Sequence, residues 1–226
     1  MEPSSPGGQT LSIVVVNWNA REHLLRFLGS LEAYPPAVEW DLVVVDNNST
    51  DGSVTAVERE VSWARLLVNR TNEGLSRANN AGLAGTNGQF VLLCNADILV
   101  RAGTLDALLD LAARRPRAAF VIPRLVNPDG TLQTAAGDLP TLGEAMFGHR
   151  AGRGRGTGFW WHGWDHDEEL AVGHGAEACY LVRRAAVDEI GLQDEGFPLD
   201  WEGVDCAHAA TASVTPRWNE RSSAPM

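Results

Sequence analysis

The chain has 226 residues, of which 44% are hydrophobic and 21% are charged, a composition typical of a globular protein that can bury a full core. Its formal net charge of −11 argues against nucleic acid or an anionic membrane as the main binding partner. All 18 basic residues are arginines, which excludes any chemistry that depends on a lysine.

Cysteine spacing and hydropathy indicate the cellular compartment. Cys94, Cys179 and Cys206 show no CxxC spacing, so free thiols in a reducing environment are the simplest interpretation. The first ten residues lack the apolar core of a signal peptide, and no apolar run approaches the roughly 18 residues of a membrane span. We therefore expect a cytoplasmic protein without a transmembrane segment, with room for a peripheral contact at the inner face of the membrane.

Apolar runs and helical spacings alternate through the first half of the chain. The β-branched run at 11–16 predicts a buried strand, and leucines across 24–31 predict a helix that ends before Pro35 and Pro36. Strands that alternate with helices form βαβ units, so the sequence predicts an α/β fold with a Rossmann-like, mostly parallel sheet flanked by helices. Further strands are expected at 41–46, 64–68, 89–94 and 118–122, and further helices at 53–60, 75–85 and 105–112.

The pattern becomes irregular after Pro123. Residues 127–130, Asn-Pro-Asp-Gly, predict a tight turn, and residues 148–169, rich in Gly, Arg and Trp, predict a long loop. We expect a further strand at 179–182 that leads into a helix at 184–190. The resulting division is a disordered tail at 1–10, a domain at 11–205 with halves at 11–115 and 116–205, and an irregular tail at 206–226.

Three predicted strands end in acids or amides. Asn17 and Asn19 follow the first strand, Asp46 ends the second, and Asp97 follows the strand at 89–94. Because the carboxyl ends of parallel strands meet at the same edge, we expect these side chains to gather where open α/β sheets hold their ligands. Asp46 suits a nucleobase or ribose contact, since a carboxylate accepts hydrogen bonds from imide or hydroxyl donors. Taken singly, each residue is equally compatible with ordinary loop chemistry.

The stretch at 88–97 is the most informative part of the chain. Five apolar residues, Phe90 to Cys94, end abruptly in Asn95-Ala96-Asp97, as expected for a strand buried on both faces of a parallel sheet. Asp97 is costly to desolvate unless a cation meets it. A hard divalent ion that also binds a phosphate is the partner we expect there.

Several motifs in this order resemble the nucleotide-binding half of family-2 glycosyltransferases with a GT-A-type fold. Segments 123–133 and 178–184 resemble the bacterial rhamnosyltransferase-like branch, and the resemblance covers roughly residues 11–205. The motifs are Asn17-Trp18-Asn19, Val-Val-Asp46-Asn-Asn-Ser-Thr-Asp-Gly-Ser, Asn72-x-Gly-x-x-x-Ala-x-Asn-x-Gly82 and Asn95-Ala96-Asp97.

The resemblance implies an inverting hexosyltransferase of cell-envelope polysaccharide synthesis. It would use a dTDP- or UDP-linked nucleotide sugar, bound by residues 11–115, and a glycan or lipid-linked acceptor, bound by residues 116–205. Asp97 would be the principal ligand of Mg²⁺ or Mn²⁺, and Asp46 would contact the base. The other implied nucleotide-sugar contacts are Asn17, Asn19, Asn72, Asn95 and Asn79, the last of which stands where many relatives have an arginine.

The chain departs from the family at the expected catalytic base. Relatives usually have Trp/Tyr-x-Glu-Asp-Val-Asp, in which the aspartate after the glutamate is the base, whereas this chain has Gly203 at that position. Asp200, Glu202 and Asp205 are the remaining candidates, and one of them must reach the acceptor hydroxyl. The residues that follow lack the amphipathic helix of the family, and one hypothesis is that this tail is translated out of frame, which sequencing the gene would test.

Alternative functions remain open. Gly203 and the unusual tail favour a truncated or catalytically impaired domain that binds nucleotide sugar without turnover. A sugar nucleotidyltransferase shares the sheet but needs a Gly-rich Arg loop after its first strand and usually a lysine, and this chain has neither. A glycoside hydrolase needs two carboxylates that face one bond and no metal-held phosphate.

The loop at 148–169 contains two weaker signals. His162 and His166 have the spacing of metal ligands on a helix, but no helical periodicity surrounds them. Three tryptophans could either stack on acceptor sugars or pack the loop against the domain, namely Trp160, Trp161 and Trp164.

Overall fold

The computed structural model describes residues 9–139, 152–153, 160–162, 164–165, 168–191 and 193–196. It forms two compact units. Unit 1 consists of residues 1–123 and 177–202, and unit 2 consists of residues 124–176 and 203–226.

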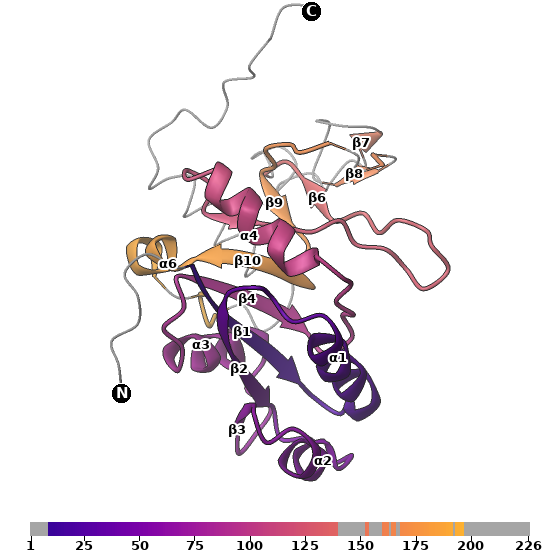
Figure 1. Cartoon of the computed structure of the whole chain (residues 1–226), viewed down its shortest axis with the longest axis vertical. Helices are drawn as coiled ribbons and strands as arrows, with labels where there is room; N and C mark the ends of the chain where they lie inside the picture. Colours follow the sequence, from indigo (N-terminus) through magenta and orange to yellow (C-terminus); the bar gives the residue numbers. More distant parts are fainter. Residues whose placement is uncertain are drawn as a thin grey trace, which may run out of the picture. The chain divides into compact units, whose positions relative to one another are not determined.

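Unit 1 is a six-stranded sheet with helices on both faces (Figure 1). Its strands are β1 (Thr10–Asn17), β2 (Glu39–Asp46), β3 (Arg65–Val68), β4 (Phe90–Asn95), β5 (Phe120–Val121) and β10 (Cys179–Arg183), in the spatial order β3-β2-β1-β4-β10-β5. The first four strands run parallel, and β10 is antiparallel to both β4 and β5. The predicted α/β fold with a mostly parallel sheet is confirmed. The helices are α1 (Arg21–Ala33), α2 (Ser53–Glu60), α3 (Leu75–Ala84), α4 (Thr104–Arg114) and α6 (Arg184–Ile190).

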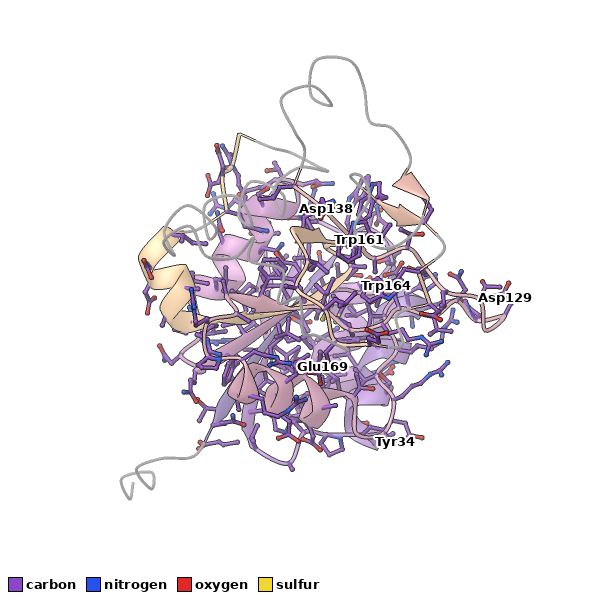
Figure 2. All side chains as sticks on the ribbon, turned by 90° about the horizontal axis from the view of Figure 1, so that it is seen from above. Tyr34, Asp129, Asp138, Trp161, Trp164 and Glu169 are labelled. Carbon is purple, nitrogen blue, oxygen red and sulfur yellow. The ribbon has the colours of Figure 1, made fainter. Side chains whose placement is uncertain are left out.

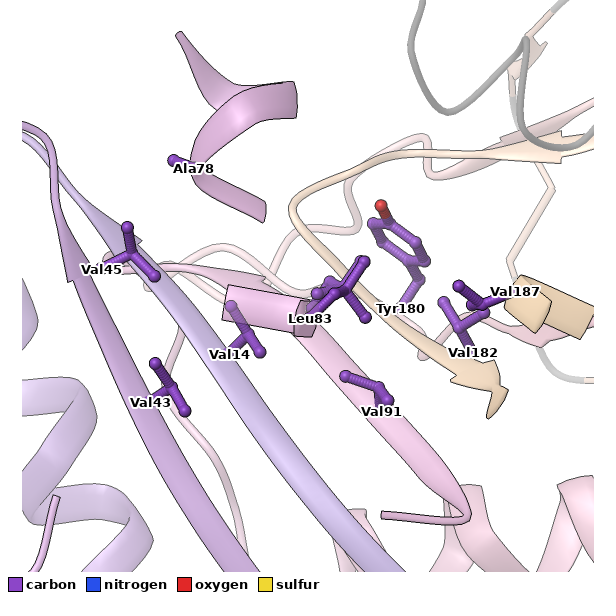
Figure 3. Packing of buried hydrophobic residues seen from close by; sticks show 10 residues of the cluster. Val14, Val43, Val45, Ala78, Leu83, Val91, Tyr180, Val182 and Val187 are labelled. Atoms are coloured by element: carbon purple, nitrogen blue, oxygen red, sulfur yellow. The ribbon is translucent and has the colours of Figure 1, made fainter. Parts of the chain in front are cut away.

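One face of the sheet packs against α3 and α6 (Figure 3). Alternate residues of four strands point to this face, because successive side chains of a strand project to opposite sides. Gly82 permits the close approach of α3, since a Cβ at this position would lie 2.3 Å from Cγ1 of Val14. The buried cluster consists of Val14, Val43, Val45, Val91, Leu93, Tyr180 and Val182 from the strands, Ala78 and Leu83 from α3, and Val187 from α6.

The opposite face is covered by α1 and α4. The guanidinium of Arg183 lies 5.0 Å from the centre of the Phe90 ring and donates to the carbonyl of Ala112, near the end of α4, over 2.7 Å. The segment that follows α1 is linked to α4, because the backbone N–H of Ala37 donates to the Asp106 carboxylate over 2.8 Å. The sheet is therefore buried on both faces, which explains the uninterrupted apolar runs of its central strands.

Most predicted elements differ from the observed ones by one or two residues at an end, as at β5 and β1. The strand expected at 118–122 is only Phe120–Val121, and it ends before Pro123, which has no N–H to donate to the ladder. Thr10, expected in the disordered tail, is the first residue of β1, and its hydroxyl accepts from the backbone of Gln89 over 2.9 Å. The predicted helices at 53–60 and 184–190 are confirmed to the residue.

The described part of unit 2 contains short ladders and turns. The antiparallel pair β6 (Ala136–Gly137) and β9 (His174–Gly175) was not predicted. The prediction of a long loop at 148–169 is wrong in part, because this segment contains the parallel pair β7 (Gly152–Arg153) and β8 (Trp161–His162). Two-residue strands leave no periodicity in a sequence, which explains both omissions. The predicted turn at 127–130 is confirmed by a bond from the N–H of Gly130 to the carbonyl of Asn127.

Within the described parts of the chain, every helix is too short or too polar to span a lipid bilayer.

Candidate functional site

The ends of three parallel strands lie side by side in unit 1. Asn17 at the end of β1 faces Asp46 at the end of β2, and Val16 faces Asn95 at the end of β4. The structure therefore brings the polar residues that follow these strands to one edge of the sheet, the edge at which open α/β sheets bind ligands.

Asp46 is the centre of a buried hydrogen-bond network. Its Oδ2 accepts from the side-chain amide of Asn17 over 2.7 Å, and its Oδ1 accepts from the backbone N–H of Ser49 over 2.8 Å. Asp46 is 1% exposed and Asn17 is 0% exposed. Each carboxylate oxygen accepts one of these bonds and keeps a lone pair, so a base contact must use the remaining acceptor capacity. The predicted contact stays a prediction.

The Oδ1 atom of Asn17 is buried and has no hydrogen-bond partner among the described residues. Its orientation is fixed, because the amide nitrogen must face the Asp46 carboxylate. A buried acceptor without a donor is costly, so a donor supplied from outside this part of the chain would stabilise the network.

Asn19 and its neighbours shape the loop that follows β2. The backbone of Asn19 has a positive φ of 50° and donates to the hydroxyl of Ser49, while its side-chain oxygen accepts from the backbone of Thr50 over 2.8 Å. Asp51 accepts from the backbones of Arg21 and Ser53, the first residues of α1 and α2. Partial burial raises the pKa of Asp51, but the bonds from Ser53 and Arg21 outweigh it, and the pKa is lowered overall.

A series of amides joins the end of β2 to the beginning of α3. The side chain of Asn69 donates to Asn47, which donates to the carbonyl of Gly74 over 3.1 Å. The exposed Asn72 accepts from the N–H of Gly74 over 3.0 Å. Sequence reasoning missed Asn47, Ser49 and Asn69, although they belong to the turn-rich stretches that follow the second and third strands.

Asn79 is not presented to solvent. It is 3% exposed, and its amide donates to Oε1 of Gln193 over 3.0 Å inside unit 1. The contact of Asn79 with a nucleotide sugar stays a prediction. In this structure the amide nitrogen of Asn79 already donates to Gln193.

Asp97 is exposed at the turn that follows β4. The turn is held by a bond from Asn95 N–H to the carbonyl of Ala178 over 2.9 Å and by one from Ile98 N–H to the carbonyl of Asn95 over 3.3 Å. No hydrogen bond or ion pair joins the Asp97 carboxylate to another described residue, and it is solvent-exposed.

Asp97 and Asn95 have side chains that suit a hard divalent cation. Within the described ranges no group of three His, Cys, Asp or Glu side chains converges. Among the described residues at the end of β4 and after it, the Asp97 carboxylate and the Asn95 amide oxygen are the groups that would hold such a cation. Mg²⁺ is commonly bound by one or two carboxylates, with water and substrate phosphates as the other ligands, and this donor set fits that pattern.

The residues predicted as the catalytic base lie outside the described residues. These are Asp200, Glu202 and Asp205, and His166 also falls there. The partner in the predicted histidine pair, His162, is exposed and lies 3.4 Å from the Thr134 hydroxyl.

Trp161 of unit 2 is packed rather than presented to solvent. Trp161 is 4% exposed, and its indole N–H donates to the Asp138 carboxylate over 3.0 Å. Its ring meets that of Trp164 edge to face at 5.4 Å (Figure 2). For Trp161 the packing interpretation is therefore the better one.

Trp18 was missed as a candidate. It stands between Asn17 and Asn19, at the edge of the sheet that holds the candidate site, and 58% of it is exposed. An exposed indole at this position can stack on a planar ring. The signal was present in the sequence as a large aromatic residue directly after a buried strand.

Comparisons with known proteins agree on one family. The model for glycosyl transferase family 2 matches residues 12–191. The chain is 33% identical over 218 residues to N-acetylglucosaminyl-diphospho-decaprenol L-rhamnosyltransferase of Mycobacterium tuberculosis, an alignment that covers 86% of this chain and 68% of the relative. It is 32% identical over 128 residues to the poly(ribitol-phosphate) beta-N-acetylglucosaminyltransferase TarS of Staphylococcus aureus, which covers 54% of this chain and 22% of TarS.

Solved structures share the fold. S. aureus TarS 1-349 superposes with a TM-score of 0.62 at 20% identity, covering 91% of this chain and 56% of TarS 1-349. The mannosyltransferase PcManGT of Pyrobaculum calidifontis, in complex with GDP-Man and Mn²⁺, has a TM-score of 0.62 at 19% identity, covering 93% of this chain and 55% of that structure. The chain therefore spans about half the length of these two structures.

Proposed function

This chain belongs to glycosyl transferase family 2, and we propose that it transfers a hexosyl group, with inversion, from a nucleotide diphosphate sugar to a glycan or lipid-linked acceptor in cell-envelope polysaccharide synthesis. The predicted family, the GT-A-type fold and the hexosyltransferase class are confirmed. The stereochemistry, the donor and the acceptor belong to the proposal.

One observation supports the proposal most directly. The exposed Asp97 carboxylate follows β4, whose neighbour β1 ends at Asn17, the hydrogen-bond partner of Asp46 at the end of β2. A site for a nucleotide diphosphate needs polar acceptors for the nucleoside and a cation for the diphosphate. Asn17 and Asp46 supply the acceptors, and Asp97 supplies the negative charge that attracts a cation.

On the donor side, each residue of the edge has a distinct role in the proposal. Asp46 and Asn17 accept from the donor groups of the base, and the exposed ring of Trp18 stacks on the base or the ribose. Asp97, with Asn95, would hold Mg²⁺ or Mn²⁺, which would offset the charge that develops on the leaving diphosphate.

The proposed transfer is a single displacement. The oxygen of the acceptor hydroxyl forms a bond to the anomeric carbon while the bond from that carbon to the phosphate oxygen breaks. The electron pair leaves with the nucleoside diphosphate, and the acceptor proton passes to a carboxylate base, for which Asp200, Glu202 and Asp205 are the candidates. Attack from the face opposite the leaving group inverts the anomeric centre.

The relatives suggest which substrates to test. The mycobacterial relative is named for transfer of L-rhamnose to a lipid-linked N-acetylglucosaminyl diphosphate, which favours a lipid-linked acceptor and an L-rhamnosyl donor; dTDP is the nucleotide that the sequence resemblance implies for that donor. TarS has been crystallised with UDP-GlcNAc and PcManGT with GDP-Man, so UDP- and GDP-linked sugars are the necessary competitors.

The test combines binding with turnover. We expect one of dTDP, UDP and GDP to raise the melting temperature of the chain in the presence of Mn²⁺, and the matching nucleotide sugar to release its nucleoside diphosphate when an N-acetylglucosaminyl-diphospho-polyprenol is added. No stabilisation by any of the three nucleotides would refute the proposal. Stabilisation without product release would favour the alternative of a catalytically impaired domain that binds nucleotide sugar, for which Gly203 is the motive.

A further inference from the structure

Ser49 joins the two loops that follow β1 and β2. Its hydroxyl oxygen accepts from the side-chain amide of Asn17 over 3.1 Å and from the backbone N–H of Asn19 over 2.8 Å. Its own backbone N–H donates to the Asp46 carboxylate over 2.8 Å. A serine hydroxyl has two acceptor lone pairs and one proton, so the bonds from Asn17 and Asn19 use both lone pairs and leave the proton to donate.

The Ser49 hydroxyl proton has no acceptor among the described residues. Both of the bonds that the hydroxyl makes to them are bonds that it accepts, and Asn17 Oδ1 is buried without a donor in the same part of the chain. Ser49 is half-buried, whereas Asp46 and Asn17 are almost completely buried. The Ser49 hydroxyl is therefore the group of this network that a ligand can reach most easily.

The network presents an unused donor beside unused acceptors. The donor is the Ser49 proton, and the acceptors include the remaining lone pairs of Asp46, whose Oδ1 already receives the Ser49 N–H. The exposed Trp18 stands in the chain between Asn17 and Asn19, the two residues that donate to the Ser49 hydroxyl. A planar ligand with an acceptor and a donor on neighbouring atoms of its edge matches this arrangement.

Nucleobases fall into two classes by this criterion. Uracil, thymine and guanine have a carbonyl oxygen next to a ring N–H, which is an acceptor beside a donor. Cytosine and adenine have an amino group next to an unprotonated ring nitrogen, which is a donor beside an acceptor. A base of the second class would turn its amino group to the Ser49 proton and a lone pair to the Asp46 carboxylate, and it would leave these polar groups unpaired.

We propose that Ser49 is a specificity-determining residue that selects the base of the donor nucleotide. Its hydroxyl donates to the carbonyl oxygen of the base, and Asp46 accepts from the adjacent ring N–H. The ligand is therefore an oxo nucleotide, by which we mean a nucleoside diphosphate of uracil, thymine or guanine. This proposal rests on the proposed function, which assigns base contacts to Asp46 and Asn17 and gives Ser49 no role.

The test compares Ser49→Ala with Ser30→Ala. Ser30 in α1 is half-buried like Ser49, and its hydroxyl also accepts from a backbone N–H, that of Val100 over 3.1 Å. We would measure by calorimetry the Kd of UDP, dTDP, GDP, CDP and ADP for the full chain with Mn²⁺. UDP and CDP differ only at the carbonyl oxygen and the adjacent ring nitrogen, so this pair isolates the two proposed contacts.

We expect the wild type to bind at least one oxo nucleotide about 10-fold or more tightly than CDP and ADP. Ser49→Ala should lose about 3- to 10-fold in affinity for that nucleotide, the value of one hydrogen bond, and should keep its affinity for CDP. Ser49→Thr, which retains the hydroxyl, should restore the wild-type preference, and Ser30→Ala should keep it.

Two results would overturn the inference and leave the proposed function intact. One is a wild-type chain that binds CDP or ADP as tightly as the oxo nucleotides, a comparison that needs no variant to fold. The other is a Ser49→Ala chain that loses affinity for all five nucleotides by the same factor, as a purely structural role requires, or for none of them. A wild-type chain that binds none of the five would instead refute the proposed function, and the inference with it.

Discussion

Asn17 and Asp46 face each other at the last register position of β1 and β2, and the Asn17 amide donates to the Asp46 carboxylate over 2.7 Å. Both residues are almost completely buried. A buried carboxylate is tolerated only where donors compensate its charge, so the second donor, the backbone N–H of Ser49, is part of the same unit. The pair therefore supports the fold as well as the candidate site.

We predict that Asp46→Asn destabilises the chain by about 1–3 kcal/mol, because an amide of the same shape has only one acceptor atom for the two donors, Asn17 and Ser49. The measurement is the midpoint and slope of urea unfolding. Nucleotide affinity in the presence of Mn²⁺ should fall as well, if the remaining lone pairs of Asp46 accept from the base. An unchanged unfolding midpoint would show that the two bonds contribute nothing to stability.

A second prediction separates the cation from the fold. Asp97 is exposed and has no partner among the described residues, so Asp97→Ala should leave the unfolding midpoint unchanged. The same change should abolish the Mn²⁺ dependence of nucleotide binding and lower turnover by about two orders of magnitude or more, typical of losing a charge stabiliser. Asp110→Ala, which removes an exposed carboxylate from α4, is the control and should behave as wild type. Near-wild-type turnover of Asp97→Ala with metal present would refute the assignment.

Strong local signals explain what the sequence alone predicted. A strand buried on both faces must be apolar throughout. The apolar runs of β1, β2 and β4 and the polar residues at their ends could therefore be predicted without the structure. The position of β10 in the sheet could not be predicted from the sequence. Its strand was expected at 179–182, but nothing local in Cys179–Arg183 states that it pairs antiparallel between β4 and β5.

The candidate site shows the same division between local and long-range information. That Asp46 and Asp97 would meet at one edge followed from parallel topology, whereas the burial of Asp46 depends on Asn17 and on the loop at Ser49. The partnership of Asn80 with Gln193 joins residues 113 positions apart, a separation that no periodicity reports. Long-range polar pairing is therefore the part of the site that the structure alone supplies.

A third prediction concerns Cys94 and Cys179, which face each other across β4 and β10 and are both buried. Burial raises the pKa of the Cys179 thiol to about 12, and burial, with the nearby Cys179 and Asp97, raises the pKa of Cys94. Because the thiolate is the reactive form, both cysteines should react with iodoacetamide at pH 8 far more slowly in the folded chain than in urea. Peptide mass spectrometry after timed quenching measures both rates, and equal rates in the two states would contradict the burial.

The same shifts determine a pH dependence. The unfolded thiol titrates near 9, so between this value and about 12 the folded state retains a proton at Cys179 that the unfolded state has lost. The contribution of Cys179 to the free energy of unfolding is therefore fully present below pH 9 and is lost as the pH rises toward 12. Cys179→Ala should reduce this alkaline loss relative to the wild type, and an identical slope of stability against pH in the two proteins would exclude Cys179 as its source.

The last prediction tests how closely α3 must approach the sheet. Gly82→Ala would place a Cβ 2.3 Å from Cγ1 of Val14, closer than real side chains approach, so α3 or β1 must shift. We expect a destabilisation of about 1–3 kcal/mol, typical of overpacking in a filled core. Gly29→Ala in α1 is the matched control, because no atom lies within 4 Å of the position that its Cβ would take and alanine favours a helix by up to about 1 kcal/mol.

Comparing the two glycine variants identifies the cause of any loss of stability. Both add one methyl group to a helix, so a difference in the sign of their effects on the urea midpoint reports the space around the Cβ and not helix propensity. A Gly82→Ala chain as stable as Gly29→Ala would mean that α3 can move away from β1 at no cost, and the close packing at Gly82 would then contribute nothing to stability.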